Sequence, residues 1–101
     1  MIASFRHRGL RRFYEQGDRR SLNPDHAGKI RQILSALEAA EAPEELDLPG
    51  FHFHRLTGNR RGTFSVTVRA NWRITFQFEQ GRAYDVHLEA VWKQSLYNRR
   101  P

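Results

Sequence analysis

The sequence contains no cysteine, which excludes both a disulfide framework and a thiolate metal site. No apolar run approaches the roughly 20 residues of a membrane-spanning helix. The N-terminus turns basic at Arg6 instead of continuing as an apolar secretory signal. These absences predict a cytoplasmic protein with no membrane partner. At 101 residues and 39% hydrophobic content, the chain is expected to fold as one domain, residues 1–92, followed by a polar basic tail, residues 93–101.

Lysine is also scarce. Of 17 basic residues, set against 11 acidic ones, only Lys29 and Lys93 are lysines, and the formal net charge is +6. Arginine offers a planar guanidinium that binds phosphate oxygens in pairs, so this composition favours a polyanionic partner. Nucleic acid and a very acidic protein are the leading candidates, while solubility alone is the simplest alternative.

The hydrophobic pattern predicts an α+β domain, with two N-terminal helices on one face of a small antiparallel sheet. After a short strand at residues 2–5, a first helix ends at Gly17, and a second begins at the Asn23–Pro24 pair and reaches about Ala40. An acidic connector leads into an antiparallel meander. Its strands are expected at residues 51–56, 63–69, 72–79 and 83–92.

Strand side chains alternate between the two faces of a sheet, so the pattern assigns each residue to a side. The core side, against the helices, is expected to hold Phe64, Val66, Val68, Ile74, Phe76, Phe78, Tyr84, Val86 and Leu88, with Trp92 in the same phase. The opposite side would be an open polar face. It is expected to hold Ser65, Thr67, Arg69, Arg73, Thr75, Gln77, Asp85, His87 and Glu89.

The polar face carries the residue types that metal-free RNA cleavage requires. A base must remove the 2′-hydroxyl proton, an acid must protonate the departing 5′-oxygen, and positive charge must stabilise the phosphorane. His54, His87, Glu89 and Arg73 supply these types. The His52-x-His54 pair could instead begin a metal site with His87 as third ligand, but no further ligand cluster stands at suitable spacing, so we expect neither metal nor cofactor.

Three stretches, "MIASFRHRGLRRFYEQG", "LPGFHFHRLTGNRRGTFSVTV" and "RANWRITFQFEQGRAYDV", resemble the HigB-type toxins of bacterial type II toxin–antitoxin pairs, within the RelE-like superfamily. The similarity runs over about residues 1–89. It implies a small α+β endoribonuclease that enters the ribosome and cuts messenger RNA during translation. It also implies a HigA-type helix-turn-helix antitoxin, through which alone the protein would reach operator DNA.

The resemblance further implies roles for single residues. His54 matches a family histidine, and Arg73 matches the arginine of the "NWR" motif, which stabilises the phosphate. The polar face itself offers His87 or Glu89 as their catalytic partner, and we expect both at the site. The RNA contacts are expected from Arg60, Arg61, Arg69, Asn71 and Lys93.

The chain departs from the family pattern at two places. Thr57 replaces a lysine, and the Asp, Tyr and His of the usual "YEDYH" ending correspond to Ala90, Val91 and Trp92, which leaves only Glu89. Three readings follow. The chain cuts with the reduced set; or its tail supplies replacements from Lys93, Tyr97, Arg99 and Arg100; or it binds ribosome, RNA or antitoxin without cutting.

Overall fold

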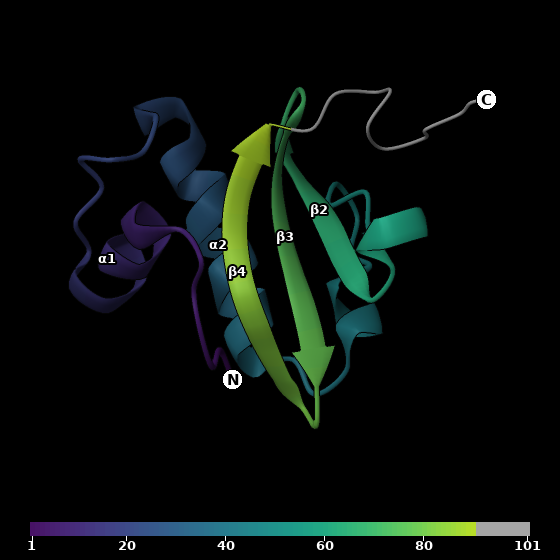
Figure 1. Ribbon diagram of the computed structural model, residues 1–101. Coiled ribbons are helices and arrows are strands. Elements are labelled where there is room, and N and C mark those ends of the chain that lie inside the picture. Colours follow the sequence, from purple (N-terminus) through teal and green to yellow (C-terminus); the bar gives the residue numbers. More distant parts are fainter. Residues whose placement is uncertain (91–101) are drawn as a thin grey trace.

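The computed structural model describes residues 1–90, and these form the predicted α+β arrangement (Figure 1). Helix α2 crosses one face of a four-stranded sheet, and α1 lies beside β4. The strands follow the order β1-β2-β3-β4, and every neighbouring pair is antiparallel. The helices and strands are α1 (Arg8–Gln16), α2 (Ala27–Ala39), β1 (His54–Arg55), β2 (Thr63–Arg69), β3 (Trp72–Glu79) and β4 (Arg82–Ala90), with short 3-10 turns η1 (Pro24–His26), η2 (Pro43–Leu46) and η3 (Gly58–Arg60).

The predicted end of the first helix is confirmed, whereas the Asn23–Pro24 pair begins a 3-10 turn and α2 itself starts three residues later, at Ala27. Gly17 adopts a left-handed conformation with φ 71° and donates its N–H to the Phe13 carbonyl, which ends α1. The Asn23 side chain accepts the Asp25 N–H at 2.9 Å, and one 3-10 turn then leads into α2. The predicted apolar stripe of α2 is buried in full: Ala27, Ile30, Ile33, Leu34 and Leu37.

The core lies between α2 and the sheet. Val66, Ile74, Phe76 and Val86 are at most 1% exposed, as the alternation predicts. Trp72 shares their phase, but it lies at the end of β3 and remains 39% exposed beside His26. Within residues 1–90, no helix is both long enough and apolar enough to cross a membrane.

The N-terminal segment is not the continuous strand that we predicted for residues 2–5. It runs parallel to β4 and makes only two isolated bridges, Ile2 with Ala83 and Phe5 with Val86. Between them the backbone ladder is interrupted, because the Ser4 hydroxyl, not a carbonyl, accepts the Asp85 N–H. The segment therefore borders the sheet at its β4 edge.

The prediction for Tyr84 is wrong. Tyr84 is paired with Gln77, on the polar side, and Ala83 takes the core position opposite Phe78 with no exposed surface. The reason is a β-bulge at Asp85, whose φ is 53°. One extra residue in β4 reverses the alternation on the N-terminal side of the bulge.

The strand predicted at residues 51–56 is much shorter than expected, since only His54 and Arg55 pair with β2. His52 has a φ of 49°, which removes it from the extended conformation. The expected pairing of His52 and His54 on one side of a strand is therefore absent. The predictions for Trp92 and for the tail lie outside the described residues.

Candidate active site

A row of polar side chains crosses all four strands. The register pairs His54 with Ser65, Ser65 with Thr75, and Thr75 with His87. Cα partners point to the same side of a sheet, so the two histidines stand at the two ends of this row. Three strand spacings of about 4.8 Å separate their backbones by about 14 Å. The small Ser65 and Thr75 between them leave room for the longer side chains to lean inward.

A second row lies two residues further along the strands, on the same face, and contains Thr67, Arg73 and Glu89. The structure therefore brings all four predicted catalytic residues onto one face, in two neighbouring rows. They come from β1, β3 and β4, so no local segment of the chain could assemble them. The face is polar because each strand alternates, and it is basic because Arg60 and Arg73 both reach it.

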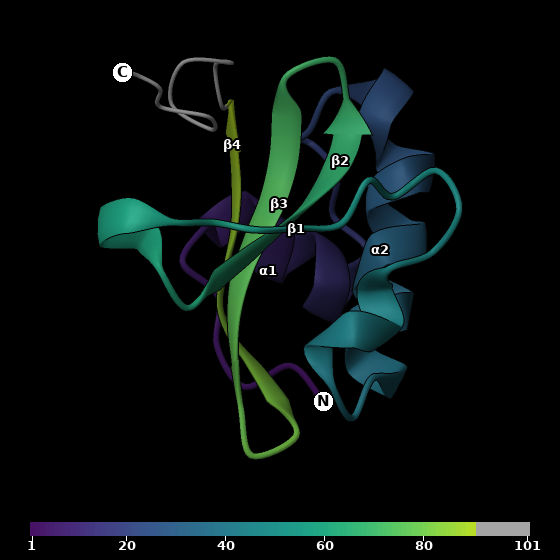
Figure 2. The ribbon, with the colours of Figure 1, turned by 90° about the vertical axis from the view of Figure 1, so that its right-hand side faces the viewer.

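The polar face is less open than we predicted. Ser65 is fully buried and Thr75 is 2% exposed, although neither lies against a helix. The turn η3 projects on the side of the sheet opposite α2, as Figure 2 shows. Arg60 of η3 donates a hydrogen bond to Glu89, which also accepts one from the Thr75 hydroxyl. The η3 loop therefore covers this section of the sheet face.

Glu89 is the centre of a hydrogen-bond network. Arg60 donates to both of its carboxylate oxygens, at 3.1 and 2.8 Å, and the Thr75 hydroxyl donates to one of them at 2.6 Å. Burial raises the pKa of Glu89, but the bonds from Arg60 and Thr75 outweigh it, and the net pKa is lowered. Glu89 is therefore an ionised carboxylate that is already satisfied, which suits it to holding Arg60 in place.

His87 has the opposite character. Burial lowers its pKa, and the positive charges of Arg6 and Arg60 reinforce this against the attraction of Glu89. Its Nδ1 atom is buried without a hydrogen-bond partner among the described residues. A neutral imidazole with an unengaged nitrogen is suited to accepting a proton. His87 also lines a small hollow of about 40 Å³ together with Arg6, Arg60, Thr75, Gln77 and Asp85.

Arg73 folds back along its strand. Its guanidinium donates to the Ala70 carbonyl at 2.9 Å, at the β2–β3 turn, while its buried Nε has no partner among residues 1–90. The guanidinium thus keeps unused donors. Such donors suit the charged oxygens of a phosphate group.

His54 is exposed on β1, at the margin of the face. Among the described residues, no group of three or more histidine, cysteine or acidic side chains lies close enough to hold a metal ion. His52 lies outside β1, and no ligand set joins it to His54 and His87.

The residues expected to bind RNA differ in their position on the sheet and in whether another side chain already engages them. Arg60 is engaged with Glu89, and Arg61 is exposed beside it. The prediction that Arg69 lies on the polar face is wrong. An irregularity near the end of β2 adds one residue, so Arg69 pairs with Trp72 and is exposed on the helix side of the sheet. Asn71 lies in the β2–β3 turn, next to the Arg73 guanidinium that bonds to that turn. Lys93 lies outside the described residues.

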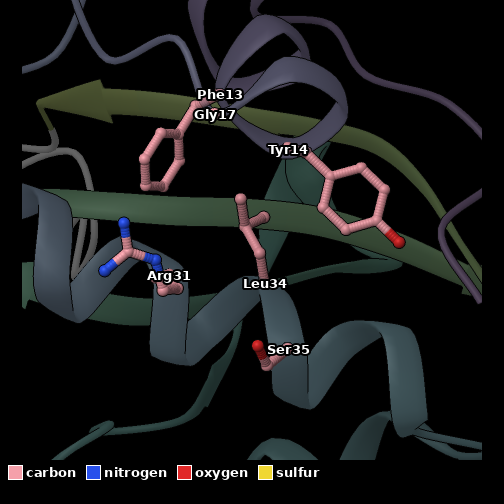
Figure 3. Close-up of a pocket in the computed structure, with 6 residues that line it drawn as sticks. All are labelled: Phe13, Tyr14, Gly17, Arg31, Leu34 and Ser35. Atoms are coloured by element: carbon pink, nitrogen blue, oxygen red, sulfur yellow. The ribbon is translucent and has the colours of Figure 1, made fainter.

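Another pocket lies between the two helices, lined by Phe13, Tyr14, Gly17, Arg31, Leu34 and Ser35 (Figure 3). Its titratable groups are Tyr14 and Arg31. Burial together with a hydrogen bond to Glu38 raises the pKa of Tyr14 to about 12. The pocket holds no histidine or carboxylate among its lining residues, so it lacks the residue types that the sheet face offers for acid–base chemistry.

Sequence reasoning missed three residues of the site. Thr75 was placed on the right face, but its hydrogen bond to Glu89 depends on the register of β3 and β4. Arg6 and His7 reach His87 from the N-terminal segment. Their sequence distance of about 80 residues carries no signal of this contact.

Comparison with known proteins agrees with this architecture. Residues 3–90 match a family model described as the RelE-like toxin of type II toxin-antitoxin system HigB. The fold and the match together define the class, which is that of RelE-like toxins. Within that class, the chain belongs to the HigB-like toxin family.

Two curated relatives cover nearly the same span. The chain is 42% identical over 89 residues to Endoribonuclease HigB of Proteus vulgaris, a match covering 88% of this chain and 97% of that protein. It is 33% identical over 91 residues to Toxin HigB-1 of Vibrio cholerae, covering 88% of this chain and 96% of the relative.

Proposed function

We propose that the protein is the toxin of a type II toxin–antitoxin pair and acts as a metal-independent endoribonuclease on messenger RNA bound to the ribosome. The observation that carries the proposal is the polar face, where Arg73 and two histidines lie in adjacent rows of one basic surface. The endoribonuclease name of the Proteus relative supports the reaction class. We further propose a cytoplasmic location and a HigA-type antitoxin with a helix-turn-helix domain.

The proposed reaction needs no group beyond the side chains and the RNA. His87, which is neutral, takes the proton of the 2′-hydroxyl while the 2′-oxygen attacks phosphorus. The bond from phosphorus to the 5′-oxygen breaks, and that oxygen receives a proton from His54 acting as acid. Arg73 stabilises the charge on the phosphorane oxygens. The products are a 2′,3′-cyclic phosphate and a free 5′-hydroxyl, with one proton taken up and one released.

Glu89 has a supporting part in this scheme. Because both carboxylate oxygens are engaged, it holds Arg60 over the sheet face, where we expect Arg60 and Arg61 to contact the RNA backbone. The same engagement favours a second candidate function. A protein whose remaining family carboxylate is occupied, and which has Ala90 where relatives carry an acid, could bind ribosome or antitoxin without cleaving.

Primer extension on messenger RNA incubated with ribosomes distinguishes the two candidates. We expect new 5′ ends with the wild type and a loss of about 10²–10³-fold in cleavage for Arg73→Ala, the scale typical of removing one oxyanion donor. Arg82→Ala is the matched control, since it removes an exposed arginine at the far end of β4. Intact messenger with folded wild-type protein would exclude cleavage and leave the binding role as the proposed function.

A further inference from the structure

His7 lies against His87, although the two residues come from opposite ends of the described chain. Their ring centroids are 5.7 Å apart and the rings are inclined at 48°. The backbone holds this arrangement, because the Arg6 and His7 N–H groups both approach the Val86 carbonyl, at 2.8 and 3.4 Å. His7 is therefore anchored to the strand residue that precedes His87.

The His7 ring is also held by α1. Its Nδ1 accepts the Leu10 N–H at 3.1 Å, which makes His7 the N-cap of this helix. A nitrogen that accepts a hydrogen bond carries no proton, so the neutral ring has its hydrogen on Nε2. A Cβ added to Gly9 would come within 2.9 Å of the His7 ring, so glycine at that position leaves space for the imidazole.

The charges around the pair oppose its double protonation. Arg6 from the N-terminal segment and Arg60 from η3 are positive, while Glu89 and Asp85 on β4 are negative. Glu89 is engaged by Arg60 and Thr75. Burial lowers the pKa of His7, and a charge on His87 lowers it further. Two half-buried imidazoles whose ring centroids lie 5.7 Å apart bind their two protons in separate steps.

We propose that His7 is a positioning residue for His87, which fixes the orientation of that imidazole and prevents the pair from holding two protons. This inference rests on the proposed function, because it assigns His87 the role of base. His7 itself touches no RNA in this scheme. It acts through its cap bond, its place over Gly9 and its contact with the second ring.

His7→Asn separates this role from that of a helix cap, since asparagine caps helices well but carries no imidazole. We expect His7→Asn to unfold near the wild-type midpoint while its kcat falls about tenfold at unchanged KM, part of the roughly 10²–10⁴ that a positioned base contributes. His7→Ala loses both the cap and the ring. Full kcat in His7→Asn beside a reduced kcat in His7→Ala would show that only the cap matters and would overturn the proposal.

A second readout needs neither RNA nor ribosomes. The pKa values of the two histidines can be followed by NMR titration of their carbon-bound imidazole protons. In His7→Asn, the chemical shift of the His87 protons should differ from the wild type. In His87→Asn, the pKa of His7 should be raised. If both titrations match the wild type, the rings are uncoupled and the proposal is wrong even if cleavage occurs. If the coupling is present but the wild type does not cleave, the proposed function fails while the pairing stands.

Discussion

At the scale of single residues, the face contains charged groups in two different states. Glu89 is fully engaged by Arg60 and Thr75, whereas His87 and Arg73 each have a buried nitrogen without a partner among residues 1–90. A buried polar atom without a partner costs free energy, and such atoms are concentrated here, on Ser65, Arg73 and His87. We infer that Glu89 serves structure, whereas Arg73 and His87 keep hydrogen-bonding capacity that no described protein group uses.

Glu89→Gln tests the structural part of that division. The change removes the charge that binds Arg60, and we expect it to lower the free energy of unfolding by about 1–2 kcal/mol at pH 7. Because the pKa of Glu89 is depressed in the folded state, its contribution is present above the unfolded value of 4.5 and is lost as pH falls through the folded pKa. Urea unfolding from pH 7 to pH 3 should show the gap between variant and wild type closing.

Glu44→Gln provides the control for this measurement. Glu44 pairs with Arg55, and both side chains are more than half exposed, so the pair should contribute little at any pH. An equal loss in the two variants, or a gap for Glu89→Gln that stays constant down to pH 3, would contradict the role assigned to the network.

At the scale of elements, the helix ends and the strand irregularities have clear local causes. Gly17 ends α1 because it adopts a positive φ, and Asp85 bends β4 because it forms a bulge. The first could be predicted, since glycine after an amphipathic run is a typical helix stop. The bulge at Asp85 could not be predicted, because an aspartate within a strand pattern does not indicate a bulge. The face of Tyr84 was therefore predicted wrongly.

Two glycines test the helix assignments with opposite signs. A Cβ at either Gly17 or Gly28 meets nothing within 4 Å, so only backbone conformation matters. Gly17→Ala places alanine at φ 71° and should lower the free energy of unfolding by about 1 kcal/mol. Gly28→Ala lies in the first turn of α2 and should raise the free energy of unfolding, by at most about 0.5–1 kcal/mol. Thermal unfolding should show shifts of about 4–8 °C per kcal/mol in opposite directions, and shifts of the same sign would contradict the assignment.

At the scale of the whole molecule, the formal net charge is +6, and within residues 1–90 some arginines form ion pairs while others do not. Arg20, Arg55 and Arg60 are paired with acidic side chains. Arg61 is exposed beside the polar face, whereas Arg69 is exposed at the end of β2 on the helix side of the sheet. This distribution favours contact with a backbone of phosphates along the face, in keeping with the proposed substrate.

Binding to a 2′-O-methyl oligonucleotide, which cannot be cleaved, should therefore weaken steeply with salt. With about four phosphate contacts, affinity should fall roughly 50-fold between 50 and 200 mM salt, because each contact on a single strand contributes a slope of about 0.7. Fluorescence anisotropy measures this directly. Arg61→Ala should reduce the slope by about one contact and Arg82→Ala should not. A slope near zero would mean that the charge serves solubility alone.

The sequence by itself determined the class of fold, the buried stripe of α2, the limits of β2 and β3, the basic character and the family resemblance. These properties follow from local periodicity, capping residues and composition, which each segment carries within itself. Only the tertiary structure decided the face of Tyr84, the engagement of Glu89 by Arg60, and the contact of His7 with His87. Each of these depends on strand register or on the meeting of distant segments. Alternation assigns a side chain to a face, but only packing decides what it touches there.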